Sequence, residues 1–178
     1  DVLNSGGSKQ YAYEHYLAKM NYPANDNWGV ESAPLGTVDV TTLQQTNGFQ
    51  ALANGGVYEE GYIIDSITDN TGNVIYNHES TSVRIYSEAT ASIMNDMMRS
   101  VINAKITTPF KDAISSLNGN LGKADWVGKT GSTNNWSDSW LVVSTPSITI
   151  SSWSGRDDNK GTDSAAGTRT ANYMAYLI

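Results

Sequence analysis

The sequence of 178 residues contains no cysteine, which excludes disulfide bonds, thiolate metal sites and cysteine nucleophiles. Positive charge is also scarce, because 11 Lys and Arg stand against 18 Asp and Glu and the formal net charge is -7. Sequence-independent binding of nucleic acid needs clustered Lys and Arg, so we expect no nucleic-acid partner. No apolar run approaches the roughly 20 residues that cross a bilayer, so any membrane anchor is expected outside these residues.

Catalytic side chains are few as well. The only histidines are His15, in an aromatic stretch of an expected helix, and His78, in a polar loop, and we interpret both as surface or packing residues. The sequence has neither the Gly-x-Ser-x-Gly elbow of α/β-hydrolases nor the His-Glu-x-x-His pair of zinc proteases. These absences argue against a His-assisted serine hydrolase and against a zinc hydrolase.

Apolar spacing predicts four helices. The hydrophobic content of 39% and charged content of 16% are those of a globular chain, and the length favours one domain. Helices are expected over residues 9–20, 41–54, 87–103 and 163–177. Thr41 or Thr42 is expected to cap the second helix with Gln44 or Gln45, and Ser87 the third. The apolar residues expected to pack are Tyr13, Tyr16, Leu17 and Met20 in the first helix, Ile93, Met94, Met97, Met98 and Val101 in the third, and Tyr173, Met174 and Leu177 in the last.

Residues with high β-propensity predict two groups of strands. A hairpin is expected from 62–64 and 74–76, joined by a turn at 69–72. Three further strands are expected over 126–133, 139–144 and 147–153, and Thr145-Pro146 indicates an antiparallel hairpin for the last two. Helices first, then an antiparallel sheet closed by a helix, is an α+β arrangement.

The strongest local motif is Lys129-Thr130-Gly131-Ser132, preceded by Gly128. A phosphate-binding P-loop requires four residues between its first glycine and the Gly-Lys pair, whereas Gly122 and Gly128 are separated by five. A P-loop must also open a helix, and this motif leads through polar residues into another strand. The motif is therefore better interpreted as a Lys-Thr-Gly triplet on a strand beside a cleft.

Several runs around this triplet resemble class A (bifunctional) penicillin-binding proteins of the Gram-positive type. They occur in the family's order at residues 29–36, 38–44, 49–58, 72–76, 124–131 and 153–158. The resemblance implies the penicillin-binding transpeptidase fold, shared with serine β-lactamases, in which helices flank an antiparallel sheet. It also implies that residues 1–178 are the C-terminal portion of a single transpeptidase domain, whose N-terminal part is missing from this chain.

By this resemblance, Lys129 would bind the terminal carboxylate of a peptide, and the Thr130 and Ser132 hydroxyls would hydrogen-bond it. Gly131 would allow close approach of the acyl group, and the Ser132 N–H would form half of the oxyanion hole. The family usually has Thr at the position of Ser132. Further residues expected to line the substrate-binding cleft are Thr133, Asn134 and Trp136.

The family's nucleophile motif, Ser-x-x-Lys, does not occur in these 178 residues, and Thr108-Pro109-Phe110-Lys111 is a poor substitute. Its second motif, Ser-x-Asn, occurs at Ser116 and Ser132, but both copies lie too close to Lys129. We therefore expect both motifs on a preceding fragment of the same protein. That fragment is either a proteolytic product that stays associated or part of a continuous chain.

The activity that the resemblance implies is D,D-transpeptidation of peptidoglycan stem peptides through a serine acyl-enzyme, with β-lactam antibiotics as inhibitors. No cofactor and no metal is expected. The full protein would also carry a glycosyltransferase domain and would sit on the extracellular face of the bacterial cytoplasmic membrane, anchored by an N-terminal segment. Two alternatives share the fold: a serine β-lactamase, marked by rapid turnover of penicillin, and a penicillin-binding sensor domain, marked by a stable adduct without cross-linking.

Overall fold

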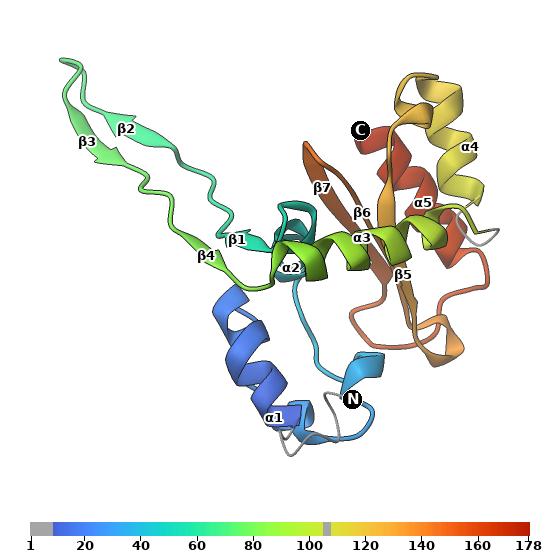
Figure 1. Ribbon diagram of the computed structural model, residues 1–178. Coiled ribbons are helices and arrows are strands. Elements are labelled where there is room, and N and C mark those ends of the chain that lie inside the picture. Colours follow the sequence, from blue (N-terminus) through green and yellow to red (C-terminus); the bar gives the residue numbers. More distant parts are fainter. Residues whose placement is uncertain (1–8, 105–107) are drawn as a thin grey trace.

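A three-stranded antiparallel sheet in the order β5-β6-β7 lies at the centre of the computed structural model, which describes residues 9–104 and 108–178 (Figure 1). Its strands are β5 (Val127–Ser132), β6 (Asp138–Thr145) and β7 (Ile148–Gly155). All three predicted strands and the predicted hairpin between the last two are confirmed. The mixed α+β class is confirmed as well.

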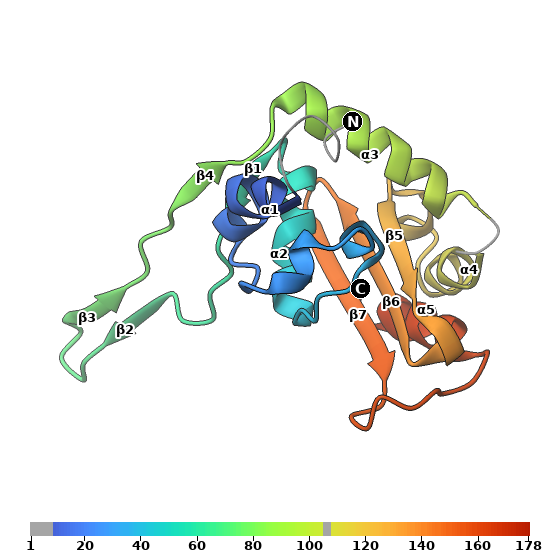
Figure 2. The same cartoon turned by 90° about the horizontal axis from the view of Figure 1, so that it is seen from below.

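Helices cover both faces of this sheet (Figure 2). On one face, α4 (Thr108–Leu117) and α5 (Ala166–Leu177) pack over Leu141 and Val143, whose side chains belong to the main core. On the other face, α2 (Thr42–Ala53) contacts β6 and β7. Strand residues alternate between the two faces, so Val142 and Ser151 lie on the α2 side. The helix α4 was not predicted from the sequence.

The main core lies between the sheet and the helices α4 and α5. Phe110 of α4 is fully buried, and its ring meets Trp126 edge-on with 5.4 Å between the ring centroids. The indole N–H of Trp126 donates to the carbonyl of Leu121 at 2.8 Å, so this buried polar group is satisfied. The core residues are Ile102, Phe110, Ile114, Trp126, Leu141, Val143, Ala171, Met174 and Ala175.

The first predicted helix is helical throughout but changes type, from α1 (Lys9–Ala12) to a π-helix (Tyr13–Leu17) and a 3₁₀ turn (Ala18–Met20). Short 3₁₀ helices follow at Asp26–Gly29 and Ala33–Leu35, and later at Leu121–Lys123 and Asn134–Trp136. Met20 is buried in a second, smaller core with Ala51, Tyr58 and Ile85. The predicted capping box of α2 is confirmed, with Thr41 and Gln44 as its members.

An extended arm projects from the body between α2 and α3 (Figure 1). At its base β1 (Val57–Glu59) pairs with β4 (Ser82–Arg84), and toward its tip β2 (Ser66–Thr68) pairs with β3 (Val74–Asn77). The predicted turn is confirmed, because Asp69 accepts hydrogen bonds from Thr71 and Asn73 across it. The predicted strand at 62–64 is wrong, because the turn geometry brings 66–68 opposite β3.

The helix α3 (Glu88–Ile102) runs alongside the edge strand β5 and contacts it on one narrow side. Met98 and Ile102 are buried there, but Ile93 and Met97 are 64% and 61% exposed. The predicted apolar stripe is therefore wrong for these two residues and for Met94, which is also exposed. The same applies to α5, where Met174 is buried but Tyr173 and Leu177 are exposed. Within the described part of the chain, no helix is long and apolar enough to cross a membrane.

Candidate functional site

A groove of about 820 Å³ runs along β5 and the face of the sheet beside it. One wall is formed by the sheet, with Lys129, Trp140 and Trp153 among its residues. The opposite wall is formed by residues 33–42, which lead into α2. β5 is the edge strand of the sheet, and consecutive residues of it line this groove. The sheet-side lining residues are Lys129, Thr130, Gly131, Ser132, Thr133, Asp138, Trp140, Val142 and Trp153.

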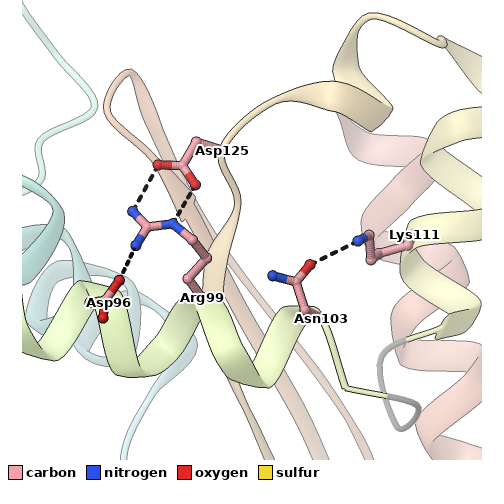
Figure 3. A network of polar contacts seen from close by, with 5 residues as sticks. All are labelled: Asp96, Arg99, Asn103, Lys111 and Asp125. Carbon is pink, nitrogen blue, oxygen red and sulfur yellow. Dashed lines mark hydrogen bonds and ion pairs between the residues drawn. The ribbon is translucent and has the colours of Figure 1, made fainter.

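The position of β5 is fixed from the side of α3 (Figure 3). Arg99 of α3 binds both carboxylate oxygens of Asp125, with its Nε 2.6 Å from Oδ1 and an Nη 2.8 Å from Oδ2. The same guanidinium binds Asp96 at 2.7 Å. These hydrogen bonds from Arg99 hold the pKa of Asp125 below its usual range. Asp125 lies two residues before β5, so this ion pair anchors the start of the strand that carries Lys129.

Close contact between α3 and β5 depends on Gly128. A Cβ at this position would lie 2.3 Å from the carbonyl oxygen of Val142 and 3.0 Å from the Cδ1 of Ile102. No side chain fits there without movement of the backbone. A side chain at Gly131 would be less crowded than one at Gly128. Its Cβ would lie 3.2 Å from the Cβ of Trp140, the residue that pairs with Gly131 on β6.

Five of the seven predicted site residues line the groove together: Lys129, Thr130, Gly131, Ser132 and Thr133. The ammonium of Lys129 lies against its own strand and donates to the carbonyl of Thr130 at 2.8 Å. Asn134 lies instead in a neighbouring hollow of about 640 Å³, which Thr133 also lines.

Trp136 lines neither the groove nor the neighbouring hollow. It sits in the turn between β5 and β6, with a positive φ of 57°. Its carbonyl accepts hydrogen bonds from both the N–H and the hydroxyl of Thr162, at 3.0 and 2.6 Å. These hydrogen bonds hold the turn against the segment before α5. The contact of Trp136 that they show is a structural one.

Sequence reasoning missed Asp138 as a site residue. Its carboxylate accepts hydrogen bonds from the Thr133 hydroxyl at 3.0 Å and from the Trp153 indole at 2.8 Å. Its backbone N–H donates to the Thr133 hydroxyl oxygen at 2.8 Å. The three residues lie on different strands or connections, so no local motif joins them. The one available signal was the antiparallel pairing of β6 and β7, which brings their ends together.

Comparison with known proteins gives one consistent result. A family model described as the penicillin-binding protein transpeptidase domain matches residues 10–166. Penicillin-binding protein 1A of Rickettsia typhi is 34% identical over 151 residues, which cover 76% of this chain and only 19% of that relative. The chain thus spans less than a fifth of the length of this relative.

Solved structures agree on the fold. Penicillin-binding protein 1A from Haemophilus influenzae superimposes with a TM-score of 0.78 at 19% identity, covering 96% of this chain and 30% of that one. The PonA1 protein from Mycobacterium tuberculosis, in complex with penicillin V, gives a TM-score of 0.72 at 16% identity, covering 97% of this chain and 50% of that one. At these identities the likeness establishes the fold.

Proposed function

Because the chain belongs to the family of the penicillin-binding protein transpeptidase domain, we propose that it forms one wall of the active site of a peptidoglycan D,D-transpeptidase. The observation that carries this proposal is the groove along β5, which Lys129, Thr130 and Ser132 all line. An ammonium and two hydroxyls at the edge of a groove suit a substrate with a terminal carboxylate.

In the proposed reaction a serine attacks the penultimate D-Ala carbonyl of a stem peptide, and the terminal D-Ala leaves with the proton that the serine gives up. An amine of a second stem peptide then attacks the ester, forms the cross-link and releases the serine. Lys129 would hold the terminal carboxylate with Thr130 and Ser132. The Ser132 N–H would stabilise the developing oxyanion, and removal of such a donor typically costs on the order of 10²–10³ in rate.

The nucleophile is proposed to come from sequence outside these 178 residues. Two observations support this: Ser-x-x-Lys is absent from the chain, and the chain spans only 19% of its Rickettsia typhi relative. The groove also has apolar lining, which includes Leu17, Phe49 and Val142. Apolar surface of this kind is stabilised when another segment packs on it. We propose that the segment carrying Ser-x-x-Lys and Ser-x-Asn does so.

The proposal for the whole protein is based on the resemblance to the family. Residues 1–178 would be the C-terminal portion of the transpeptidase domain of a class A protein of the Gram-positive type. The full protein would also contain a glycosyltransferase domain and would act at the outer face of the cytoplasmic membrane, held by an N-terminal segment. Its ligands would be stem peptides and β-lactams, as PonA1 in its complex binds penicillin V.

Labelling with a fluorescent penicillin tests the proposal. In the complete domain, Lys129→Ala should abolish labelling while leaving the melting temperature near that of the parent. Lys123→Ala is the matched control, since Lys123 lies on the 3₁₀ helix before β5 and is not among the groove residues. Near-normal labelling of Lys129→Ala would refute the assignment. Rapid release of hydrolysed penicillin would favour a β-lactamase instead.

A further inference from the structure

The arm between α2 and α3 exposes most of its apolar side chains. It projects away from the central sheet and its helices in both views (Figure 1, Figure 2). Ile63 is 98% exposed and Ile75 is 68% exposed. The large apolar residues exposed along the arm are residues 62–64, Ile67, residues 74–76 and Val83. Single exposed apolar residues are ordinary on a protein surface, whereas a contiguous group of them marks a site of interaction.

The backbone of the arm is also incompletely paired. Among the described strands, β2 and β3 pair only with each other, so every second N–H and C=O group of each strand points away from the pair. Hydrogen bonds to Asp69 fix the turn, and the rings of Tyr62 and His78 stack with 3.7 Å between their centroids. These contacts leave Ile63 and Ile75 uncovered. An isolated two-stranded hairpin is marginally stable at best in water, so we expect further packing to hold the arm in this shape.

The charge of the arm narrows the choice of partner. Residues 59–79 contain no Lys or Arg, and five acidic residues, namely Glu59, Glu60, Asp65, Asp69 and Glu79. None of the five forms an ion pair with another residue in the part of the chain that the structure describes. Two arms side by side would therefore repel each other, and so would an arm and a membrane of anionic lipid. The charge instead favours a partner surface that contains Lys and Arg.

From these observations we infer that the arm docks on a surface of the same protein outside these 178 residues, and that this surface combines apolar residues with Lys and Arg. The chain covers only 30% of penicillin-binding protein 1A from Haemophilus influenzae and 19% of the relative from Rickettsia typhi, so these relatives contain much further sequence. A surface in the same polypeptide is held near the arm at a high effective concentration, which suits a hairpin that is marginal alone. The inference goes beyond the proposed function, because it does not depend on the reaction at the groove.

Hydrogen exchange of the full-length protein, followed by mass spectrometry, tests the docking. The amides of β2 and β3 should exchange slowly in the parent, because the arm must leave its partner before they meet water. Ile75→Asn should speed this exchange on the order of 10- to 100-fold, the factor by which burial of an apolar side chain of this size shifts an equilibrium. Ile93→Asn is the matched control, since Ile93 is 64% exposed but lies on α3. This control should leave the exchange of the arm unchanged.

Charge reversal gives a second, independent measurement. Replacing Asp65 and Glu79 together by lysine should speed the exchange of the arm by about 2- to 10-fold at low salt, since exposed ion pairs contribute modestly. High salt should speed the exchange in the parent and reduce the difference between parent and variant. Asp112→Lys is the control, because this exposed acidic residue lies on α4, away from the arm.

Melting curves verify that each variant is folded, and Ile75→Thr replaces Ile75→Asn if the asparagine prevents folding. Equally fast exchange of the arm in the parent and in the folded Ile75 variant would overturn the inference. Slow exchange that appears only as the protein concentration rises would overturn it in favour of a second copy. Slow exchange that requires vesicles of phosphatidylglycerol would overturn it in favour of a membrane. Labelling with fluorescent penicillin should stay normal in Ile75→Asn, and absence of label from the parent would overturn the proposed function alone.

Discussion

Replacing Gly128 by alanine should destabilise the domain far more than the same change at Gly131, three residues further along β5. The added Cβ at Gly128 would lie 2.3 Å from the carbonyl oxygen of Val142, which is backbone and cannot rotate away. It would also lie 3.2 Å from the Cα of Val143 and 3.0 Å from Ile102. Relief requires β5 to separate from β6 or from α3. At Gly131 the nearest atom is the Cβ of Trp140, at 3.2 Å, and a shift of a few tenths of an ångström suffices.

The magnitudes separate the two variants. Overpacking a well-packed core costs about 1–3 kcal/mol, and a Gly→Ala change offsets about 0.4–1 kcal/mol of this by restricting the unfolded chain. For Gly128→Ala the net loss of unfolding free energy should be about 1–2 kcal/mol. For Gly131→Ala the two contributions nearly cancel, and we expect a change within about 0.5 kcal/mol.

Urea unfolding of the complete domain, followed by tryptophan fluorescence, measures both variants. The midpoint should fall for Gly128→Ala at an unchanged dependence on urea, which identifies a change in stability alone. Penicillin acylation adds a contrast, because Gly131 lines the groove and its alanine variant should lose acylation while keeping its stability. Equal midpoints for the two variants would refute the argument that β5 is held this tightly against β6 and α3.

Two further changes test how β5 and α2 are held. Arg99 lowers the pKa of Asp125, so their contact stabilises the fold above the unfolded pKa of about 3.9 and is lost as the pH falls through the lower folded value. Asp125→Asn should therefore lower the melting temperature slightly at pH 7, and its difference from the parent should vanish in acid and shrink in high salt; a difference that persists in acid would contradict this account. Thr41→Ala removes the capping box of α2 and should cost about 1 kcal/mol in urea unfolding, whereas Thr37→Ala, outside the cap, should cost much less.

Local sequence patterns determined the elements that depend on neighbouring residues. The capping box at Thr41 and Gln44 was predicted because its members lie three residues apart. The antiparallel hairpin of β6 and β7 was predicted because a short polar link joins two runs of strand-forming residues. The triplet at Lys129 was recognised by its residues and their order. The assignment of catalytic roles to this triplet stays a prediction.

Patterns that depend on the surroundings were predicted less well. Apolar spacing identified α3 as a helix but not which of its apolar residues are buried, since Ile93 and Met97 face outward from a helix that runs along a sheet edge. In the arm, 62–64 has the composition of a strand. The turn at Asp69 fixes the register of the hairpin, however, and this register places residues 66–68 opposite β3.

The sequence by itself determined the helices and strands that follow from local spacing, and the triplet Lys129-Thr130-Gly131. Only the tertiary structure decided what surrounds that triplet. The opposite wall at residues 33–42 lies about ninety positions before Lys129, and the contacts of Asp138 join residues from the ends of three strands. Such contacts are made when strands pair and layers pack, and packing places no constraint on the spacing of these residues along the chain. The contacts of Thr133 and Asp138 were therefore decided by the fold.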